Sequence, residues 1–246
     1  MPPRERVPLS IVVPVFNEGQ NFPALWRELT SGVRSPFTAY VVFDFDEDDT
    51  VPVVASMIER GEKRLRLVKN QIKRGVVGAI SAGFQVAPAG PLLVLMADCS
   101  DDVEQIDRML NRYYEGADIV VGSRYMKGGK LIGGPWFKQF LSRMSGLTLH
   151  WFRGLPTHDA TNAFKIYDGE MVRAFSIESS GGFELNLELT VKAFLAGNVI
   201  AEVPVSWRDR SAGKSKFKLW RWLPKYLRWY FYAFQPRRSR ARLQST

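Results

Sequence analysis

Short apolar segments alternate with helical segments through the first half of the 246-residue chain, and this alternation limits the fold more than any other feature. The apolar segments that we predict to be strands are residues 9–13, 39–43, 65–68, 91–96 and 118–121. Predicted helices separate them, among them residues 53–60, 75–86 and 103–114. Strands that alternate with helices at this spacing predict an α/β fold with a mostly parallel central sheet and helices on both faces.

The second half of the chain is less regular. We predict helices at residues 136–152 and 184–196, a polar loop at 156–162 and a strand at 199–205. Ligands of parallel sheets bind outside the carboxyl ends of the strands, so four loops are candidates for a site. These loops are residues 14–18, 44–50, 97–102 and 122–129.

Composition excludes several classes of site. One cysteine, Cys99, and two histidines leave too few ligands for a thiolate zinc site or a histidine-rich metal site. The first residues carry charge but no following apolar segment, so we expect a cytoplasmic protein. The net charge of +9 predicts an anionic partner, which can be nucleic acid, phospholipid or a phosphorylated substrate.

A polar segment rich in carboxylates follows the predicted strand at 91–96. Asp98, Ser100, Asp101 and Asp102 offer the oxygen ligands that Mg²⁺ or Mn²⁺ prefers. The same residue types also cap helices, and a predicted helix begins at Val103. This segment alone therefore leaves both interpretations open.

Four motifs in order resemble glycosyltransferase family 2, most closely its polyprenyl-phosphate and dolichyl-phosphate sugar synthases. They are Val13-Pro-Val-Phe-Asn-Glu18, Gly122-Ser-Arg-Tyr125, Asp159-Ala-Thr-Asn-Ala-Phe-Lys165 and Asp209-Arg-Ser-Ala-Gly-Lys-Ser-Lys216. The resemblance covers residues 9–218. It implies the GT-A fold and an inverting transfer of a sugar from a nucleotide diphosphate, of the GDP-mannose or UDP-glucose type, to a polyprenyl or dolichyl phosphate. It also implies Mg²⁺ or Mn²⁺ as cofactor.

The resemblance assigns roles to particular residues. Those implied in nucleotide binding are Pro14, Phe16, Asn17, Glu18, Asp44, Asp46 and Lys214. Those implied in catalysis are Asp98, Arg124, Arg143, Arg210 and Lys216, with Asp98 and Ser100 as metal ligands. Those implied in acceptor binding are Arg124, Arg143, Thr161, Asn162 and Lys165.

Several positions depart from the family pattern. Met96 replaces the first carboxylate of the acidic triplet, so Asp101 or Asp102 is expected to assist a metal at Asp98. Lys165 replaces an arginine, which keeps the charge but removes bidentate geometry. A family glutamate aligns with Glu188, and the neighbouring Glu184 remains an alternative.

Residues 217–246 form a predicted basic, aromatic helix and tail that follows a catalytic domain at 1–216. Cations interrupt the segment too often for a transmembrane span, and its aromatic content suits a membrane interface. We expect the protein to lie peripherally on the cytoplasmic face of a membrane. The residues expected at that interface are Trp220, Trp222, Trp229 and Tyr230, with a second patch at Trp136, Phe137, Phe140, Trp151 and Phe152. The alternative is a helix that packs on the core of the domain.

Two other functions compete with lipid-phosphate glycosylation. The same fold can transfer a sugar to a saccharide or other hydroxyl, which requires a carboxylate as general base. A protein with a decayed active site can act as a basic scaffold on membrane or nucleic acid. Arg124 and Arg143, as a pair of cations at the acceptor, argue against a hydroxyl acceptor. The retained family motifs argue against a decayed active site, so we expect no nucleic-acid partner.

Overall fold

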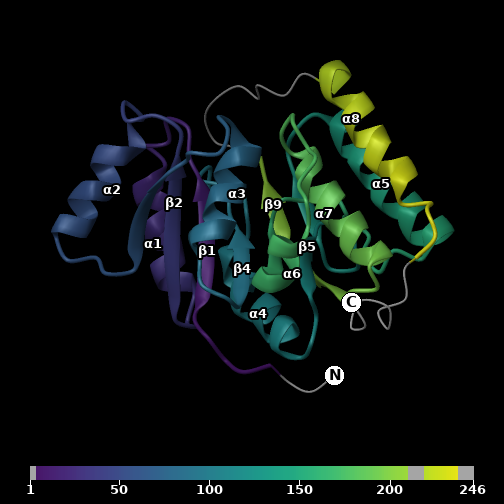
Figure 1. The fold of residues 1–246 in the computed structure, drawn as a ribbon, viewed down its shortest axis with the longest axis horizontal. Helices are drawn as coiled ribbons and strands as arrows, with labels where there is room; N and C mark the ends of the chain where they lie inside the picture. Colours follow the sequence, from purple (N-terminus) through teal and green to yellow (C-terminus); the bar gives the residue numbers. More distant parts are fainter. Residues whose placement is uncertain (1–3, 210–218, 238–246) are drawn as a thin grey trace.

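The computed structural model describes residues 4–209 and 219–237, with one large sheet between layers of helices (Figure 1). The sheet has seven strands in the order β3-β2-β1-β4-β7-β5-β8. Their bounds are β1 Leu9–Pro14, β2 Phe37–Phe43, β3 Leu65–Lys69, β4 Pro91–Val94, β5 Ile119–Ser123, β7 Lys165–Asp168 and β8 Ile200–Pro204. All pairings are parallel except those of β7, so the predicted mostly parallel GT-A sheet is confirmed.

The antiparallel strand β7 lies in the middle of the sheet, where sequence analysis placed no strand. Its Tyr167 pairs with Leu92 of β4 and with Ile119 of β5. The strand has only four residues and directly follows a polar loop. Such a segment is too short to show a strand periodicity in the sequence.

Helices cover both faces of the sheet, as predicted. One face carries α1 Phe22–Gly32, α2 Thr50–Glu59 and α4 Ile106–Tyr114, the last after a 3₁₀ turn at Val103–Gln105. The other face carries α3 Val76–Val86, α6 Gly169–Ala174 and α7 Glu184–Leu195.

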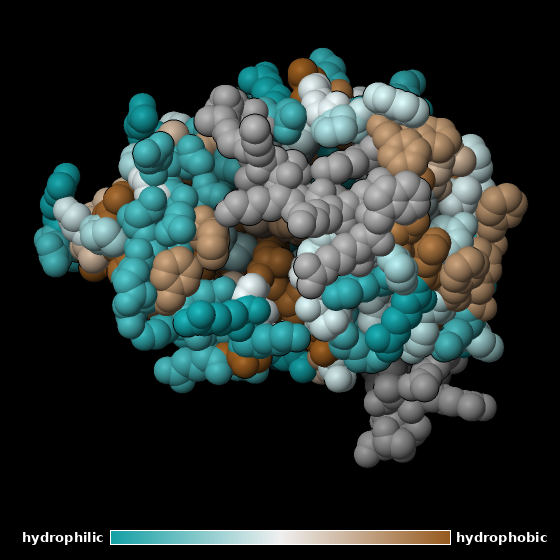
Figure 2. Space-filling view, turned by 90° about the horizontal axis from the view of Figure 1, so that it is seen from above, coloured by the Kyte–Doolittle hydropathy of each residue, from teal (hydrophilic) through white to brown (hydrophobic). Residues whose placement is uncertain are grey.

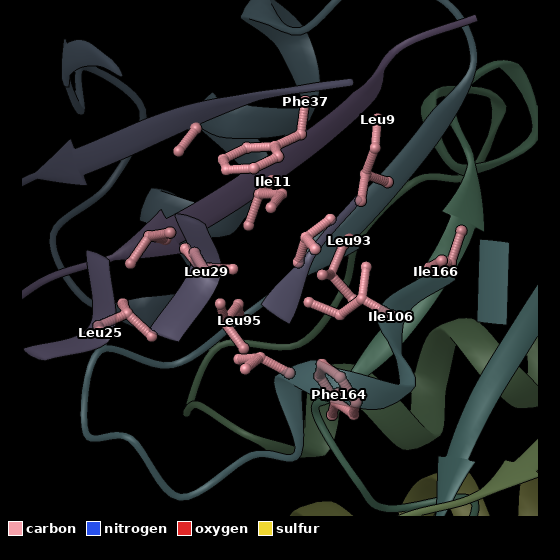
Figure 3. Packing of buried hydrophobic residues seen from close by; sticks show 14 of the residues in the cluster. Leu9, Ile11, Leu25, Leu29, Phe37, Leu93, Leu95, Ile106, Phe164 and Ile166 are labelled. Carbon is pink, nitrogen blue, oxygen red and sulfur yellow. The ribbon is translucent and has the colours of Figure 1, made fainter. Parts of the chain in front are cut away.

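Side chains of the central strands alternate between the two helical layers. Figure 3 shows the first layer, where Leu25 and Leu29 of α1 lie near Ile11 of β1 and Leu93 of β4. Val12 of β1 belongs to the core on the opposite face. Because both faces are covered, these strands are apolar along their whole length, which explains why they were recognisable in the sequence.

The C-terminal helix α8, Leu219–Tyr232, packs on α7 and beside α5, Trp136–Arg153. Trp229 is only 1% exposed, so the expectation that it inserts into a bilayer is wrong. Tyr230 Oη donates a hydrogen bond to Thr148 Oγ1 at 3.0 Å, and Arg153 Nε donates to the Ala233 carbonyl at 2.6 Å. The predicted helix is therefore present, and its inner side belongs to the core of the domain.

The carboxyl ends of the parallel strands point to the top of the molecule in Figure 1, and Figure 2 views the molecule from that side. A two-stranded sheet of β6, Lys130–Ile132, and β9, Ser206–Arg208, accompanies the large one. Within residues 4–209 and 219–237, no helix is both long enough and apolar enough to cross a membrane.

Candidate active site at the carboxyl ends of the strands

The loops after β1 and β2 are tied together by hydrogen bonds. The Asn17 amide donates to Asp48 Oδ2 at 3.0 Å, and the Asp49 amide donates to Asn17 Oδ1 at 3.3 Å. The Glu18 amide donates to Thr50 Oγ1 at 2.9 Å. Asp48 is fully buried and was not recognised from the sequence, where its only signal is an Asp-x-Thr pattern at the start of a helix.

The described nucleotide-binding candidates all lie on these two loops or at the end of β1. Asp44 Oδ1 accepts from Asn70 Nδ2 and Oδ2 accepts from the Gly75 amide, both at 2.7 Å, so Asp44 fixes the loop after β3. Asp46 is exposed and pairs with Lys69. The remaining candidates are the buried Pro14, the exposed Phe16 and Asn17, and the half-buried Glu18.

The metal-binding candidates follow β4. Asp98 Oδ1 accepts from Ser100 Oγ at 2.6 Å and from the Ser100 amide at 3.2 Å. Ser100 is itself buried, so it orients Asp98. Asp102 Oδ2 accepts from the Ser206 amide at 3.0 Å, so Asp102 anchors β9.

Asp101 suits the role of a second metal ligand beside Asp98 better than Ser100 or Asp102 does. Its Oδ2 is buried and has no hydrogen-bond partner in the described part of the chain. Burial, helped by the nearby charge of Asp98, raises the pKa of Asp101 to about 7. A divalent cation between Asp98 and Asp101 would satisfy the unpaired oxygen and offset both charges, so the residues present fit Mg²⁺ or Mn²⁺.

Residues 4–209 and 219–237 hold no cluster of three or more histidine, cysteine, aspartate or glutamate side chains arranged for a metal. Two carboxylates are nevertheless enough for Mg²⁺, which commonly takes its other ligands from water and from substrate phosphates. Water and a phosphorylated ligand could therefore complete the coordination here.

Arg124, which follows β5, forms a bidentate ion pair with Asp159. Arg124 Nε lies 2.7 Å from Asp159 Oδ2, and Nη2 lies 2.8 Å from Oδ1. Burial disfavours the charge on Arg124, but the Asp159 carboxylate outweighs it and raises the pKa of the guanidinium. Among the described residues, Nη1 has no hydrogen-bond partner and remains able to bind a ligand.

Arg143 is exposed on α5, one residue after Ser142, whose Oγ lies 3.3 Å from Arg124 Nη2. Ser142 Oγ also lies 2.7 Å from Thr161 Oγ1. Arg124 lies over the ring of Tyr125, with its guanidinium carbon 5.1 Å from the ring centroid. The structure thus links Arg124 and Thr161 through Ser142, and Arg143 is the next residue of α5.

Asn162 and Lys165, the other two acceptor candidates, do not face a ligand. Asn162 Nδ2 donates to the Gly122 carbonyl at 2.7 Å. Lys165 is fully buried, and its Nζ donates to the carbonyls of Ala160 at 2.7 Å and Asn186 at 3.2 Å. Burial lowers the pKa of Lys165 to about 7. Both side chains brace the backbone behind the site, so the prediction that they bind the acceptor gains no support from these contacts and stays a prediction.

Glu184 and Glu188 of α7, the two alternatives for the family glutamate, differ in their surroundings. Glu188 accepts from the amides of Glu178 at 2.7 Å and Ser179 at 2.8 Å, so it has a structural role. Glu184 Oε1 accepts from the Gly181 amide at 2.7 Å, whereas its Oε2 is buried without a hydrogen-bond partner in the described residues.

Glu202 of β8 accepts hydrogen bonds from the loop before Asp159, and sequence analysis did not identify it. It accepts from Thr157 Oγ1 at 3.1 Å, from the His158 amide at 2.9 Å and from His158 Nδ1 at 2.6 Å. These contacts fix the loop that presents Asp159 to Arg124. No sequence signal connects Glu202 to this loop, because 44 residues separate it from His158.

A broad exposed apolar face lies beside the acceptor residues, over α5 and α8. The exposed large apolar residues of α5 are Trp136, Phe137, Phe140, Trp151 and Phe152, and those of α8 and the turn after it are Leu227, Phe231 and Phe234. Figure 2 shows hydrophobic colours at its right side, where Figure 1 places these two helices. Arg210, Lys214 and Lys216 lie outside the described residues, so their roles stay predictions.

A sequence model of glycosyl transferase family 2 matches residues 10–175. Polyprenol monophosphomannose synthase of Mycolicibacterium smegmatis is 27% identical over 211 residues, which cover 84% of this chain and 79% of that protein. Dolichol-phosphate mannosyltransferase of Pyrococcus furiosus is 25% identical over 85% of this chain, which spans only 59% of that protein. Glucosyl-3-phosphoglycerate synthase from Mycobacterium tuberculosis, solved with Mn²⁺, UDP and glucosyl-3-phosphoglycerate, shares the fold with a TM-score of 0.66 at 13% identity, over 94% of this chain and 81% of that one.

Proposed function

The chain belongs to glycosyl transferase family 2, and we propose that it transfers a sugar from a nucleotide diphosphate to a polyprenyl phosphate at a membrane surface, with inversion of the anomeric centre. The observation that carries this proposal is the position of Arg143. This exposed cation directly follows Ser142, whose Oγ lies 3.3 Å from Arg124 Nη2, and it is on the same helix as the aromatic residues Trp136, Phe140 and Trp151. The two curated relatives, which are named for prenyl-phosphate mannosylation, support the same acceptor.

The donor would extend along the carboxyl edge, with its nucleoside at the loops after β1 and β2 and its diphosphate near Asp98. Asp98 and Asp101 would hold Mg²⁺ or Mn²⁺, which neutralises the negative charge that grows on the departing diphosphate. Ser100 keeps Asp98 in position through the hydrogen bond to Asp98 Oδ1. The Mn²⁺ and UDP in the neighbouring Mycobacterium tuberculosis structure support this assignment.

A phosphate acceptor explains why arginines lie where the nucleophile would arrive. A phosphate monoester is ionised at neutral pH, so it needs little help from a base. It does need positioning against repulsion by the donor diphosphate. Arg124 Nη1 and the Arg143 guanidinium can each donate charge-assisted hydrogen bonds to its oxygens. Attack on the sugar from the side opposite the leaving diphosphate inverts the anomeric centre.

Helix α5 has its apolar face outward, which supports contact with lipid. Its inner side carries small and polar residues: Ser142 contacts Thr161, and a Cβ at Gly146 would clash with the His158 carbonyl. Its outer side carries Trp136, which is 76% exposed, and Trp151, which is 66% exposed. Tryptophan side chains favour the headgroup region of a bilayer, so this face would set the enzyme on the membrane with Arg143 at headgroup depth.

Calorimetric titration tests the donor half of the proposal. We expect UDP, GDP or one of their glucose or mannose conjugates to bind in Mn²⁺ and to lose affinity in a chelator. Asp98→Asn and Asp101→Asn should each weaken metal-dependent binding at least about tenfold, because each removes one ligand charge. Asp102→Asn is the matched control, since its amide oxygen can still accept from Ser206. Failure of every sugar nucleotide to bind the wild-type protein would overturn the proposed function.

A second candidate, transfer to a hydroxyl acceptor, is favoured by one observation. A hydroxyl nucleophile needs a general base, and Glu184 Oε2 is a buried carboxylate oxygen without a hydrogen-bond partner in the described residues. Burial, with the charge of Glu184 as a further cause, raises the pKa of the neighbouring Tyr226. Under this alternative Glu184→Gln abolishes transfer to a hydroxyl, whereas the lipid-phosphate reaction should tolerate the change.

A further inference from the structure

The loop at residues 155–158 contacts both β8 and α5. Glu202 of β8 accepts three hydrogen bonds from this loop. From α5, the His150 ring stacks on the His158 ring with a centroid distance of 4.2 Å. A Cβ at Gly146 of the same helix would lie only 2.0 Å from the His158 carbonyl oxygen. The loop is therefore closely fitted to both elements.

The Thr157 hydroxyl joins Glu202 to Asp159. Its oxygen accepts from the Asp159 amide at 3.1 Å, and it lies 3.1 Å from Glu202 Oε2. An ionised carboxylate can only accept, so the single hydroxyl proton is donated to Glu202. Thr157 and Asp159 are fully buried, and the Glu202 side chain is 13% exposed. Because water has little access to these atoms, the hydrogen bonds determine the conformation of the loop.

We propose that Glu202 is a positioning residue, which acts through Thr157 on Asp159 and thereby directs the Arg124 guanidinium toward the acceptor phosphate. This inference rests on the proposed function, because it concerns the acceptor side of the same site. Asp159 accepts from the amide, Nε and Nη2 of Arg124 at 3.0, 2.7 and 2.8 Å. The guanidinium is planar and bound along one edge, so a shift of the Asp159 backbone would turn the whole group. Displacements of this kind can slow a reaction strongly even when the chemistry is remote.

Glu202 also holds the side chain of His158. Its Oε1 lies 2.6 Å from His158 Nδ1, and its Oε2 accepts from the His158 amide at 2.9 Å. Two substitutions separate these contacts. In Glu202→Gln the amide oxygen can still accept from Thr157 and from the His158 amide. In His158→Phe a ring remains beside His150, while the bond to Oε1 is lost. If Glu202 acts through Thr157, both variants should keep most of the activity.

The kinetic test uses Glu202→Ala and Thr157→Val. Each should raise the KM for a prenyl phosphate about tenfold and change kcat less than about threefold, because the phosphate is bound in the ground state and in the transition state alike. The Kd of UDP or GDP in Mn²⁺ should not change. The double variant should be no worse than either single variant, because both substitutions interrupt the same chain of hydrogen bonds.

A second measurement does not depend on transfer. The Nε–H of Arg124 is buried in the pair with Asp159, so its hydrogen exchange should be slow. NMR of protein labelled with ¹⁵N-arginine measures this rate, and Arg124→Lys identifies the signal. Exchange should be at least about tenfold faster in Glu202→Ala and Thr157→Val, and unchanged in Glu202→Gln. Thr157→Val keeps the shape of the side chain, so it provides the same test if Glu202→Ala does not fold.

Asp107→Ala is the matched control. Asp107 of α4 accepts from the amides of Arg34 at 2.9 Å and Ser35 at 3.1 Å, so it also holds a loop, but at the amino end of β2. It should lower stability to urea without changing the KM for the acceptor or the Arg124 exchange rate.

Three results would overturn the positioning role of Glu202. They are an increase in KM no larger than that of Asp107→Ala, an equal loss of nucleotide affinity, and an unchanged Arg124 exchange rate in Glu202→Ala. The exchange rate decides the question even for a protein that transfers no sugar. Absence of transfer from the wild-type protein to any prenyl phosphate would instead refute the proposed function.

Discussion

Arg124 and Asp159, 35 residues apart in the chain, form a bidentate ion pair in which the carboxylate is fully buried and the arginine side chain is 13% exposed. Removing one partner of a buried pair leaves the other charge uncompensated, which typically costs about 3–5 kcal/mol. Asp159→Asn should therefore lower the free energy of unfolding by about 3 kcal/mol in urea denaturation, and it should also weaken the use of the acceptor.

The matched control for this substitution is Glu115→Gln. Glu115 pairs with Arg112 at 2.8 Å, but both side chains are more than half exposed. A surface pair of this kind contributes about 1 kcal/mol at most. Equal effects of the two substitutions would show that the Arg124–Asp159 pair does not stabilise the acceptor loop.

Arg143→Ala should affect the acceptor and leave the fold intact, because Arg143 is exposed and makes no ion pair among the described residues. Loss of a charge-assisted hydrogen bond to phosphate costs about 1.5–3 kcal/mol, so kcat/KM for a prenyl phosphate should fall about ten- to a hundredfold. Donor affinity, measured by calorimetry, should not change. Arg143→Lys should restore only part of the activity.

Arg27→Ala, at an exposed position of α1, is the control for loss of one positive charge. If Arg143→Ala weakens donor binding while acceptor kinetics hold, the phosphate-binding role of Arg143 is wrong.

Lys165 predicts a pH dependence of stability. Its folded pKa of about 7 lies below the unfolded value of about 10.4, so the folded state releases a proton first as pH rises. Below pH 7 both states are protonated and the cost of burying the charge is fully present. Between about pH 7 and pH 10 the unfolded state binds more protons, so stability should rise relative to Lys165→Met by up to about 1.4 kcal/mol per pH unit. Urea denaturation of both proteins across this range measures the difference, and a constant difference would contradict the buried, neutral amine.

The exposed apolar face predicts binding to vesicles. Replacing Trp151 and Phe152 together by serine should reduce cosedimentation with anionic vesicles, because both side chains are exposed on α5. The fold should survive, since neither side chain belongs to the core. Replacing Val86 by serine controls for loss of an exposed apolar residue elsewhere. Unchanged vesicle binding in the double variant would exclude this end of α5 from the membrane contact.

The location of the site was predictable because parallel strands bring their carboxyl ends to one edge. Asn17, Asp44 and Asp98 each follow a recognisable apolar strand, so their loops could be placed together from the sequence. The contacts that organise the site were not predictable. Arg124 contacts Asp159 because β7 pairs antiparallel with β5 in the sheet. This strand has four residues, and no local sequence pattern predicts it.

Residue type alone gave a wrong or unsupported interpretation where the same residue suits two environments. The aromatic, basic sequence of α8 suits a membrane interface, but Trp229 packs inward, with Lys192 Nζ 4.9 Å from the centroid of its ring. Lys165 retains the charge type of the family arginine, yet its amine lies between two backbone carbonyls. Only tertiary packing distinguishes these cases.

The most direct test of the account is a transfer assay with radiolabelled GDP-mannose and UDP-glucose, Mn²⁺ and vesicles that contain either a polyprenyl phosphate or the corresponding polyprenol. The account predicts that label moves to the phosphorylated lipid from at least one donor, that the polyprenol stays unlabelled, and that Arg143→Ala slows the reaction. Transfer to the polyprenol or to an added saccharide, with none to the lipid phosphate, would contradict it.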